Sequence, residues 1–197
     1  MDIPGLIDIP TLEYYRTHEN VVHPRLSTQG AACYDLCSHL VTQEDGVGAS
    51  GKRLVTLFTP TNKEVEILPQ CSGDGKWSVM IPPHFRAIIP TGVIFKIPQG
   101  HSVRLHSRSG LSIKKGFIVA NCEGVIDEDY FHEIKSLMVN NSDVPIEVFH
   151  KDRIVQAEIV QTLDHVIQET DIKPSQTTDR TGGLGSTGVS TQESQNA

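Results

Sequence analysis

The segment FRAIIPTGVIFKIPQG, residues 85–100, decides the fold class. It contains two short apolar runs, 85–89 and 93–97, and each run ends in a turn that contains proline and glycine. Short apolar runs bounded by such turns are typical of β-strands. Neither run has the length or the 3.6-residue period of a helix. We therefore predict two consecutive strands in this segment.

The same pattern continues along the chain. Further short apolar runs occupy 103–106, 117–119, 134–139, 146–149 and 154–160, and polar turns such as 140–143 separate them. Because no long segment has a helical period, the sequence predicts an all-β domain. One short helical turn is expected over 111–115, after Gly110. Residues 6–17 are the only other place where the sequence permits a helix.

Two regions differ from the strand-rich part. Glycine-rich joints surround two strand-like runs, 54–58 and 65–68, and predict an inserted hairpin or surface lobe over about 39–78, which offers a surface for a protein partner. After residue 165 large apolar residues become rare, while Ser, Thr, Gln and Gly dominate. We therefore expect a β domain over 1–165 and a mobile carboxy-terminal arm over 166–197.

Composition argues against several classes of protein. The formal net charge of −7 opposes binding to duplex nucleic acid or to an anionic membrane, because both need a basic face. No segment has the length of a membrane span, and no basic leader precedes an apolar run, so we expect a soluble intracellular protein. The 4 cysteines and 9 histidines lack the spacing of metal ligands, and the cysteines are expected to be reduced thiols.

Three segments carry candidate chemistry. In Gly124–Tyr130, a strand-like pair precedes Asp127, which could be held rigidly at the edge of a pocket with Tyr130 beside it; the alternative is a plain turn. Arg108–Gly110 offers a guanidinium, a hydroxyl and an unobstructed amide for phosphate oxygens; the alternative is a surface turn. The glycine-rich tract 182–188, with Arg180 ahead of it, could wrap an oligophosphate or could be a flexible linker.

Together with two further segments, these motifs resemble those of the trimeric dUTPase family, in the order of that family. The five segments are Ala32–Leu36, Arg108–Leu111, Asn121 with Gly124–Tyr130, Asp152–Gln156, and Arg180 with Gly182–Gly188. Cys33, His132 and Lys151 stand where the family usually has glycine, and Leu184 stands where it usually has phenylalanine.

The resemblance implies a jelly-roll-like β-clip barrel and a homotrimer with active sites at the subunit interfaces. It also implies hydrolysis of dUTP to dUMP and pyrophosphate, assisted by Mg²⁺ that the triphosphate and water hold without direct side-chain ligands. Asp127 would be the general base that activates water for attack on the α-phosphorus. Tyr130 would pack against the deoxyribose, and Asp35 would support the site.

The remaining roles that the resemblance implies concern the base and the phosphates. The uracil edge would be read by Asn121, Gly124, Val125, Ile126 and Lys135. The phosphates would be held by Arg108, Ser109, Gly110 and Gln156. The arm would close over the substrate with Arg180, Leu184, Gly185, Ser186 and Thr187.

Two alternative functions remain open from the sequence. A dCTP deaminase has a similar fold, but its catalytic glutamate would correspond to Leu137 in this chain. A nucleotide-binding regulator acting through residues 39–78 is the second alternative, and Asp127 beside Tyr130 favours catalysis over it.

Overall fold

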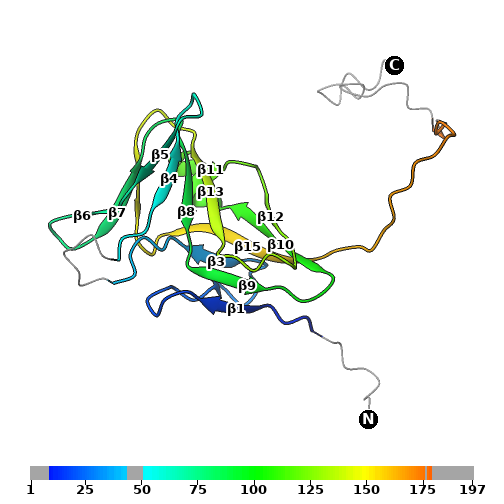
Figure 1. Ribbon diagram of the computed structural model, residues 1–197, viewed down its shortest axis with the longest axis horizontal. Coiled ribbons are helices and arrows are strands. Elements are labelled where there is room, and N and C mark those ends of the chain that lie inside the picture. The colour runs from blue at the N-terminus through cyan, green and yellow to red at the C-terminus, as the bar shows by residue number, and fades with distance from the viewer. Residues whose placement is uncertain (1–8, 44–50, 176, 179–197) are drawn as a thin grey trace, which may run out of the picture. The chain divides into compact units, whose positions relative to one another are not determined.

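The computed structural model describes residues 9–43, 51–175 and 177–178. Within them, strands form two five-stranded sheets and two smaller ones (Figure 1). The first large sheet has the order β12 (Gly124–Ile126), β10 (His101–Ser107), β15 (Arg153–Gln161), β3 (Tyr34–Cys37) and β2 (Arg25–Leu26). The second has the order β11 (Phe117–Val119), β13 (Lys135–Asn140), β8 (Arg86–Pro90), β4 (Val55–Phe58) and β5 (Glu64–Ile67). The all-β prediction is confirmed.

The smaller sheets are β14 (Ile146–Phe149), β7 (Trp77–Ile81) and β6 (Gln70–Cys71), and the pair β1 (Glu13–Arg16) with β9 (Val93–Lys96). All pairings are antiparallel among the strands that the structure describes. Apolar side chains from both large sheets form one core. In β10, Val103 and Leu105 point into this core, whereas Arg104 and His106 are only half-buried on the other face. The strand alternation therefore separates a core face from a polar face.

The predicted turn at 90–92 is present, and the permitted helix over 6–17 is wrong for the residues that the structure describes. β1 pairs with β9, so that Tyr14 lies opposite Phe95. Two adjacent tyrosines suit a pleated strand better than a short helix, and an available edge strand decides the outcome. Gly92 has a φ of +74°, and a Cβ there would lie 2.4 Å from Cγ2 of Val21, so this turn requires glycine.

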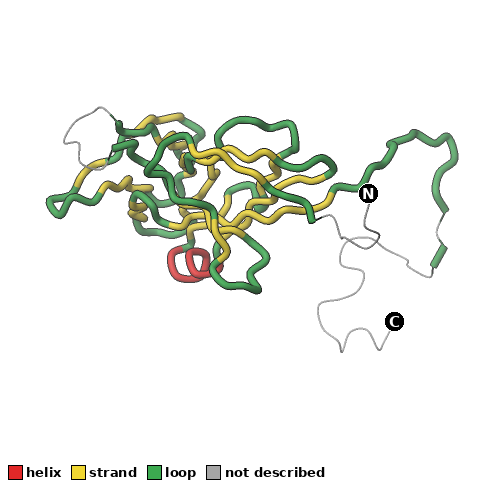
Figure 2. The backbone as a smooth tube through the Cα atoms, turned by 90° about the horizontal axis from the view of Figure 1, so that it is seen from below, coloured by secondary structure: helices red, strands yellow, loops and turns green. Residues whose placement is uncertain are grey.

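The short helix α1 spans Ser109–Lys115 and confirms the predicted helical turn, which begins two residues earlier than expected. Figure 2 shows it at the periphery of the strands. Gly116 ends the helix in the left-handed conformation, and its amide bonds back to the carbonyls of the last turn. Within the described residues no helix is long and apolar enough to cross a membrane.

The stretch predicted as an insertion contributes to the core. β4 pairs with β8 of the second sheet, and Val55 and Leu57 are at most 4% exposed. Leu40 and Val41 are also buried. Because these side chains fill the main core, β4 is an integral strand and not part of a surface lobe; β5 and β6 are the exposed parts of the stretch.

The chain divides into two units, 1–163 and 164–197, with the division two residues before the expected boundary. The described residues of the second unit, 164–175 and 177–178, contain neither helix nor strand. Val166, Ile167 and Ile172 are each at least 79% exposed. Residues 179–197, which hold the predicted glycine-rich motif, lie outside the described residues.

A buried histidine, His39, lies beside β8. Its backbone amide donates to the carbonyl oxygen of Pro90 at 2.8 Å. The side chain of His39 is 1% exposed, and its ring lies 5.2 Å from the ring of His18 and 5.4 Å from that of His150. Neither ring nitrogen of His39 has a hydrogen-bond partner in the described part of the chain. Burial, assisted by the positive charge of Arg53, lowers the pKa of His39 to about 3. His39 therefore stays neutral in the folded protein.

We expect this histidine to make the protein acid-sensitive. Below the ordinary pKa of 6.5, His39 becomes protonated in the unfolded chain, whereas in the folded protein it stays neutral until about pH 3. The free energy of unfolding should therefore fall by up to about 1.4 kcal/mol per pH unit across that window. Denaturant titrations at several pH values, compared between the wild type and His39→Gln, measure this slope. Equal slopes in both proteins would assign the acid sensitivity to other groups.

Candidate active site

A cavity of about 110 Å³ lies where β10, β12 and β13 meet, and we call it the hairpin cavity. Its lining combines Leu105, Leu137 and Val155 with polar and backbone groups. The sequence-predicted residues that line it are Asn121, Gly124, Val125, Ile126 and Lys135. The structure therefore brings all five predicted uracil-reading residues to one small cavity.

Gly124 is required for the close approach that forms this cavity. It lies opposite Leu105 in the β10–β12 pairing, and a Cβ at Gly124 would lie 3.0 Å from Cβ of Leu105. A larger residue would push β12 away from β10. The turn before Gly124 is closed by a bond from the amide of Glu123 to the carbonyl oxygen of Asn121, at 2.7 Å.

Asp127 and Tyr130 lie just beyond the cavity lining. Asp127 is exposed and follows Ile126, the last residue of β12. The amide of Tyr130 donates to the carbonyl oxygen of Asp127 at 3.1 Å, which makes the segment a tight turn. The Tyr130 hydroxyl donates to the carbonyl oxygen of Glu133 at 3.3 Å. This turn presents a carboxylate and an aromatic ring beside the cavity.

An ion pair anchors this turn to the core. Arg53 binds both carboxylate oxygens of Glu133, at 2.8 and 2.5 Å, and the two side chains are 18% and 14% exposed. The amide of Gly92 donates to the same carboxylate at 2.6 Å. The bidentate contact fixes both distance and orientation. Because 80 residues separate Arg53 from Glu133, no local pattern in the sequence signals this pair.

We expect Arg53→Met to lower the free energy of unfolding by about 2–3 kcal/mol, because it leaves the half-buried Glu133 carboxylate without its cation. Lys96→Met is the matched control: Lys96 pairs with Glu13, but the two side chains are 70% and 57% exposed. An exposed pair contributes at most about 1 kcal/mol. Denaturant titration of both variants measures the difference. Similar losses in the two variants would mean that the Glu133 pair is no more than a surface contact.

A second group of predicted residues gathers around Asp35, whose side chain is 3% exposed. Its carboxylate accepts from Oγ of Ser27 at 2.6 Å, from Nε of Arg108 at 3.1 Å and from Nη1 of Arg153 at 3.0 Å. Burial alone would raise the pKa of Asp35, but the hydrogen bonds from Ser27 and Arg153 and the charges of both arginines outweigh it. The pKa of Asp35 is therefore lower than usual. Asp35 orients two guanidinium groups.

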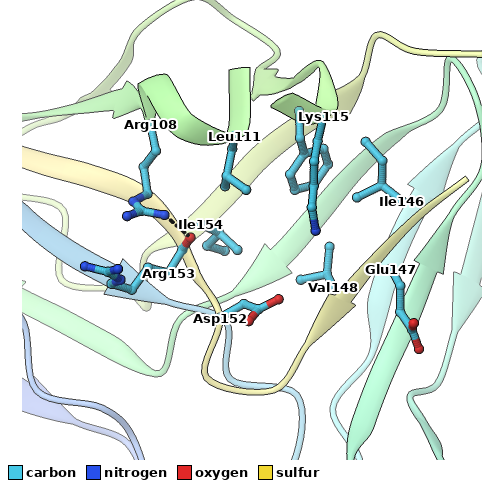
Figure 3. Close-up of a pocket in the computed structure, with 10 residues that line it drawn as sticks. Arg108, Leu111, Lys115, Ile146, Glu147, Val148, Asp152, Arg153 and Ile154 are labelled. Carbon is cyan, nitrogen blue, oxygen red and sulfur yellow. Dashed lines mark hydrogen bonds between the residues drawn. The ribbon is translucent and has the colours of Figure 1, made fainter. Parts of the chain in front are cut away.

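A second cavity, of about 210 Å³, opens beside these arginines, and we call it the arginine cavity. Figure 3 shows Arg108 and Lys115 reaching into it from the helix side, with Arg153 at the start of β15 and Asp152 just before that strand. Nη1 of Arg108 also donates to the carbonyl oxygen of Arg153 at 3.0 Å. Three cationic side chains around one opening form a suitable environment for phosphate oxygens. Arg153 and Lys115 are not among the residues predicted from the sequence to bind phosphate.

The other predicted phosphate residues lie on the same elements. Ser109 and Gly110 open α1 and are exposed, and a Cβ at Gly110 would have no heavy atom within 4 Å. Gln156 lies on β15. It is opposite His106 in the pairing with β10 and opposite Asp35 in the pairing with β3. The predicted arm residues Arg180, Leu184, Gly185, Ser186 and Thr187 lie outside the described residues.

Comparisons with known proteins identify the family of this chain. The dUTPase family model matches residues 76–188. Two similar proteins are the deoxyuridine 5'-triphosphate nucleotidohydrolases of Rhizobium rhizogenes and Nautilia profundicola. The first is 39% identical over 113 residues, which cover 57% of this chain and 71% of the relative. The second is 42% identical over 110 residues, which cover 56% and 77%. This chain belongs to the dUTPase family.

Solved structures support the same fold. The dUTPase of Staphylococcus bacteriophage 80alpha, as a mutant with dUpNHpp, matches with a TM-score of 0.61 at 20% identity, covering 91% of this chain and 99% of the phage protein. The dUTPase of Streptococcus mutans matches with a TM-score of 0.55 at 23% identity, covering 80% and 98%. A mutant dUTPase from phage phi11 of S. aureus, described with a structural Mg(II) ion, has a TM-score of 0.59 at 19% identity, covering 84% and 99%.

Proposed function

We propose that this chain hydrolyses dUTP to dUMP and pyrophosphate, with Asp127 as the general base. The observation that supports this most directly is the position of Asp127, next to the hairpin cavity that Asn121, Gly124, Val125, Ile126 and Lys135 line. A base bound in that cavity would leave its sugar and phosphates beside the exposed carboxylate. General-base catalysis requires this kind of proximity.

The size and lining of the hairpin cavity suit a pyrimidine base rather than a whole nucleotide. Its volume of about 110 Å³ is far below the roughly 300–1,000 Å³ of pockets that enclose a drug-sized ligand. The side-chain amide of Asn121 and the backbone of β12 offer both donors and acceptors to the base edge. Tyr130 would pack against the deoxyribose outside the cavity, where a ring can exclude a 2′-hydroxyl.

The chemistry needs a proton acceptor and cationic groups. Asp127 would take a proton from water as that water attacks the α-phosphorus in line with the pyrophosphate leaving group. Arg108, with Ser109, Gly110 and Gln156, would hold the phosphate oxygens. The arm residues Arg180, Leu184, Gly185, Ser186 and Thr187 would complete the site by closing over the substrate.

The described side chains fit an Mg²⁺ that enters with the substrate. The buried carboxylate of Asp35 is already engaged by Ser27, Arg108 and Arg153, so it is not placed as a direct ligand. Mg²⁺ prefers phosphate oxygens and water to a protein cage. When bound to the triphosphate, it would supply charge neutralisation during the reaction.

We also propose that the active enzyme is a homotrimer with shared sites. Arg153 and Ile154 line the arginine cavity, whereas the next residue, Val155, lines the hairpin cavity. The two cavities have no lining residue in common. A single chain thus presents a base half-site and a phosphate half-site that do not merge, and pairing with complementary half-sites of other subunits would complete each active site.

Parallel assays of pyrophosphate release with dUTP, dCTP, dTTP and UTP test this function, with ammonia measured in the dCTP reaction. We expect pyrophosphate from dUTP alone. Release of ammonia would indicate a dCTP deaminase, although Leu137 lines the hairpin cavity where that family has its glutamate. Nucleotide binding without either product would indicate a regulator, with the exposed strands β5 and β6 as its contact surface.

A further inference from the structure

We propose that Cys33, His106 and Glu158 form a binding site for one thiophilic divalent cation, with Zn²⁺ as the best match. We call these three residues the Cys33 cluster. One ligand atom from each residue lies within 4.8 Å of the other two. Nε2 of His106 and a carboxylate oxygen of Glu158 are 3.0 Å apart. All three side chains are half-buried, so the cluster is preformed yet accessible to an ion.

The sheet pairing explains why these residues meet. His106 lies on β10, Glu158 lies on the neighbouring β15, and Cys33 directly precedes β3, the next strand of the sheet. Glu158 lies opposite Arg104 of β10. His106 is two residues from Arg104 on the same polar face of β10, so its side chain is a neighbour of Glu158. The ligands therefore come from adjacent strands of a rigid sheet, which is the kind of support that holds a metal site in place.

The types of ligand decide which metal fits. Zn²⁺ accepts thiolate, imidazole and carboxylate at about 2.0–2.3 Å, and a tetrahedral arrangement then separates ligand atoms by about 3.3–3.8 Å. The ligand atoms of the Cys33 cluster, which lie within 4.8 Å of one another, would move closer together by side-chain rotation when the ion binds. Mg²⁺ prefers a shell of oxygen ligands, so a thiol and an imidazole select against it. Water would fill the fourth position, as in other zinc sites with three protein ligands.

A fourth residue supports the histidine from the other side. Nδ1 of His106 lies 3.6 Å from a carboxylate oxygen of Glu123. Metal-binding histidines usually direct their second nitrogen at a carboxylate, which fixes the tautomer and the ring orientation. Glu123 and Glu158 thus flank the same imidazole, and Nε2 is the nitrogen that contacts Glu158.

The carboxylates of Glu158 and Asp35 place negative charge near the Cys33 thiol, which favours a bound cation at this position. On binding Zn²⁺, the Cys33 thiol would release its proton to solvent, and the thiolate would bind the metal. A hydrogen bond between His106 and Glu158 alone would explain two of the three residues but would leave the position of the thiol unexplained.

The Cys33 cluster lies beside the group formed by Asp35, Arg108 and Arg153, without sharing a residue with it. Each of its residues is two positions along a strand or its extension from a predicted site residue: Cys33 from the supporting Asp35, and His106 and Glu158 from the phosphate-binding Arg108 and Gln156. Positions two apart in a strand share a face and lie about 6.6–6.8 Å apart. The proposed metal would therefore occupy the neighbouring row of the same sheet face.

Cobalt(II) is a suitable probe, because a cysteine thiolate that binds Co²⁺ gives an intense charge-transfer absorption. The full chain is stripped with a chelator, kept reduced, supplied with excess Mg²⁺ to fill oxygen-ligand sites, and titrated with Co²⁺. We expect the thiolate absorption to saturate at one Co²⁺ per chain and to disappear when Zn²⁺ is added.

Three variants test the assignment. Cys33→Ser should abolish the thiolate absorption, and His106→Gln should weaken Zn²⁺ affinity by at least about ten-fold. Cys71→Ser is the matched control, since Cys71 is an exposed free thiol on β6, and it should behave as the wild type. Absence of the absorption in the wild type, its persistence in Cys33→Ser, its loss in Cys71→Ser, or unchanged Zn²⁺ affinity in His106→Gln would overturn the proposal.

Discussion

Replacement of Asp127 by asparagine is expected to reduce the rate of dUTP hydrolysis by about 10²- to 10⁴-fold. The substitution preserves the shape of the side chain and removes its ability to accept a proton. Asp127 is exposed at the end of β12, so the fold should tolerate the change. Binding of a non-hydrolysable dUTP analogue should stay close to that of the wild type, because the hairpin cavity is unaltered.

Pyrophosphate release and analogue binding, measured on the same preparations, separate the two effects. Asp129→Asn is the matched control: this aspartate lies two residues further along the same exposed turn and has no assigned role. We expect it to retain most of the activity. If Asp127→Asn kept more than about a tenth of the wild-type rate, another group would be the base.

The fold could be predicted where local signals were strong. The proline and glycine turns at 90–92 and 98–100 mark strand ends correctly, since Gly92 needs a conformation that other residues avoid. The helix permitted over 6–17 fails because the pairing of Tyr14 with Phe95 depends on a strand about 80 residues away. The same limit applies to β4, whose position in the core sheet depends on its pairing with β8.

The candidate site shows the same division. Residues 121–126 lie on β12 and the turn before it, so a local motif predicts that they share a cavity with Lys135. Two partners of Asp35 are different, because Arg108 and Arg153 lie 73 and 118 residues away from it in the chain. Sequence motifs identify such residues one at a time, whereas their contacts arise from sheet order. The Cys33 cluster has no sequence spacing of metal ligands for this reason.

Asp35→Asn is expected to lower the free energy of unfolding by about 2–3 kcal/mol. The buried carboxylate compensates two guanidinium groups, and asparagine would leave both without an anion. Arg108 and Arg153 are 22% and 49% exposed, so water relieves part of the loss and keeps it at the lower end of the range for buried pairs. This corresponds to a fall of about 4–12 °C in Tm for a domain of this size.

The pH dependence separates this effect from that of His39. A carboxyl group whose pKa is lowered on folding stabilises the protein above its ordinary pKa of 3.8, and this contribution is lost as the pH falls further. The wild type should therefore lose stability below about pH 3.8 through Asp35, and the variant should lack this component. The His39 component begins near pH 6.5 and should persist in Asp35→Asn.

The same variant should also raise KM for dUTP, because Arg108 loses the contact that orients it toward the arginine cavity. We expect a rise of about ten-fold or more, since a positioned guanidinium fork binds phosphate better than a mobile one. Asp143→Asn is the matched control, because Asp143 is 97% exposed and contacts only the side chain of His84 among the ion pairs of the described residues. Thermal unfolding and steady-state kinetics of both variants decide the matter: if Asp35→Asn matched Asp143→Asn in Tm and in KM, the buried carboxylate would neither stabilise the fold nor orient the arginine.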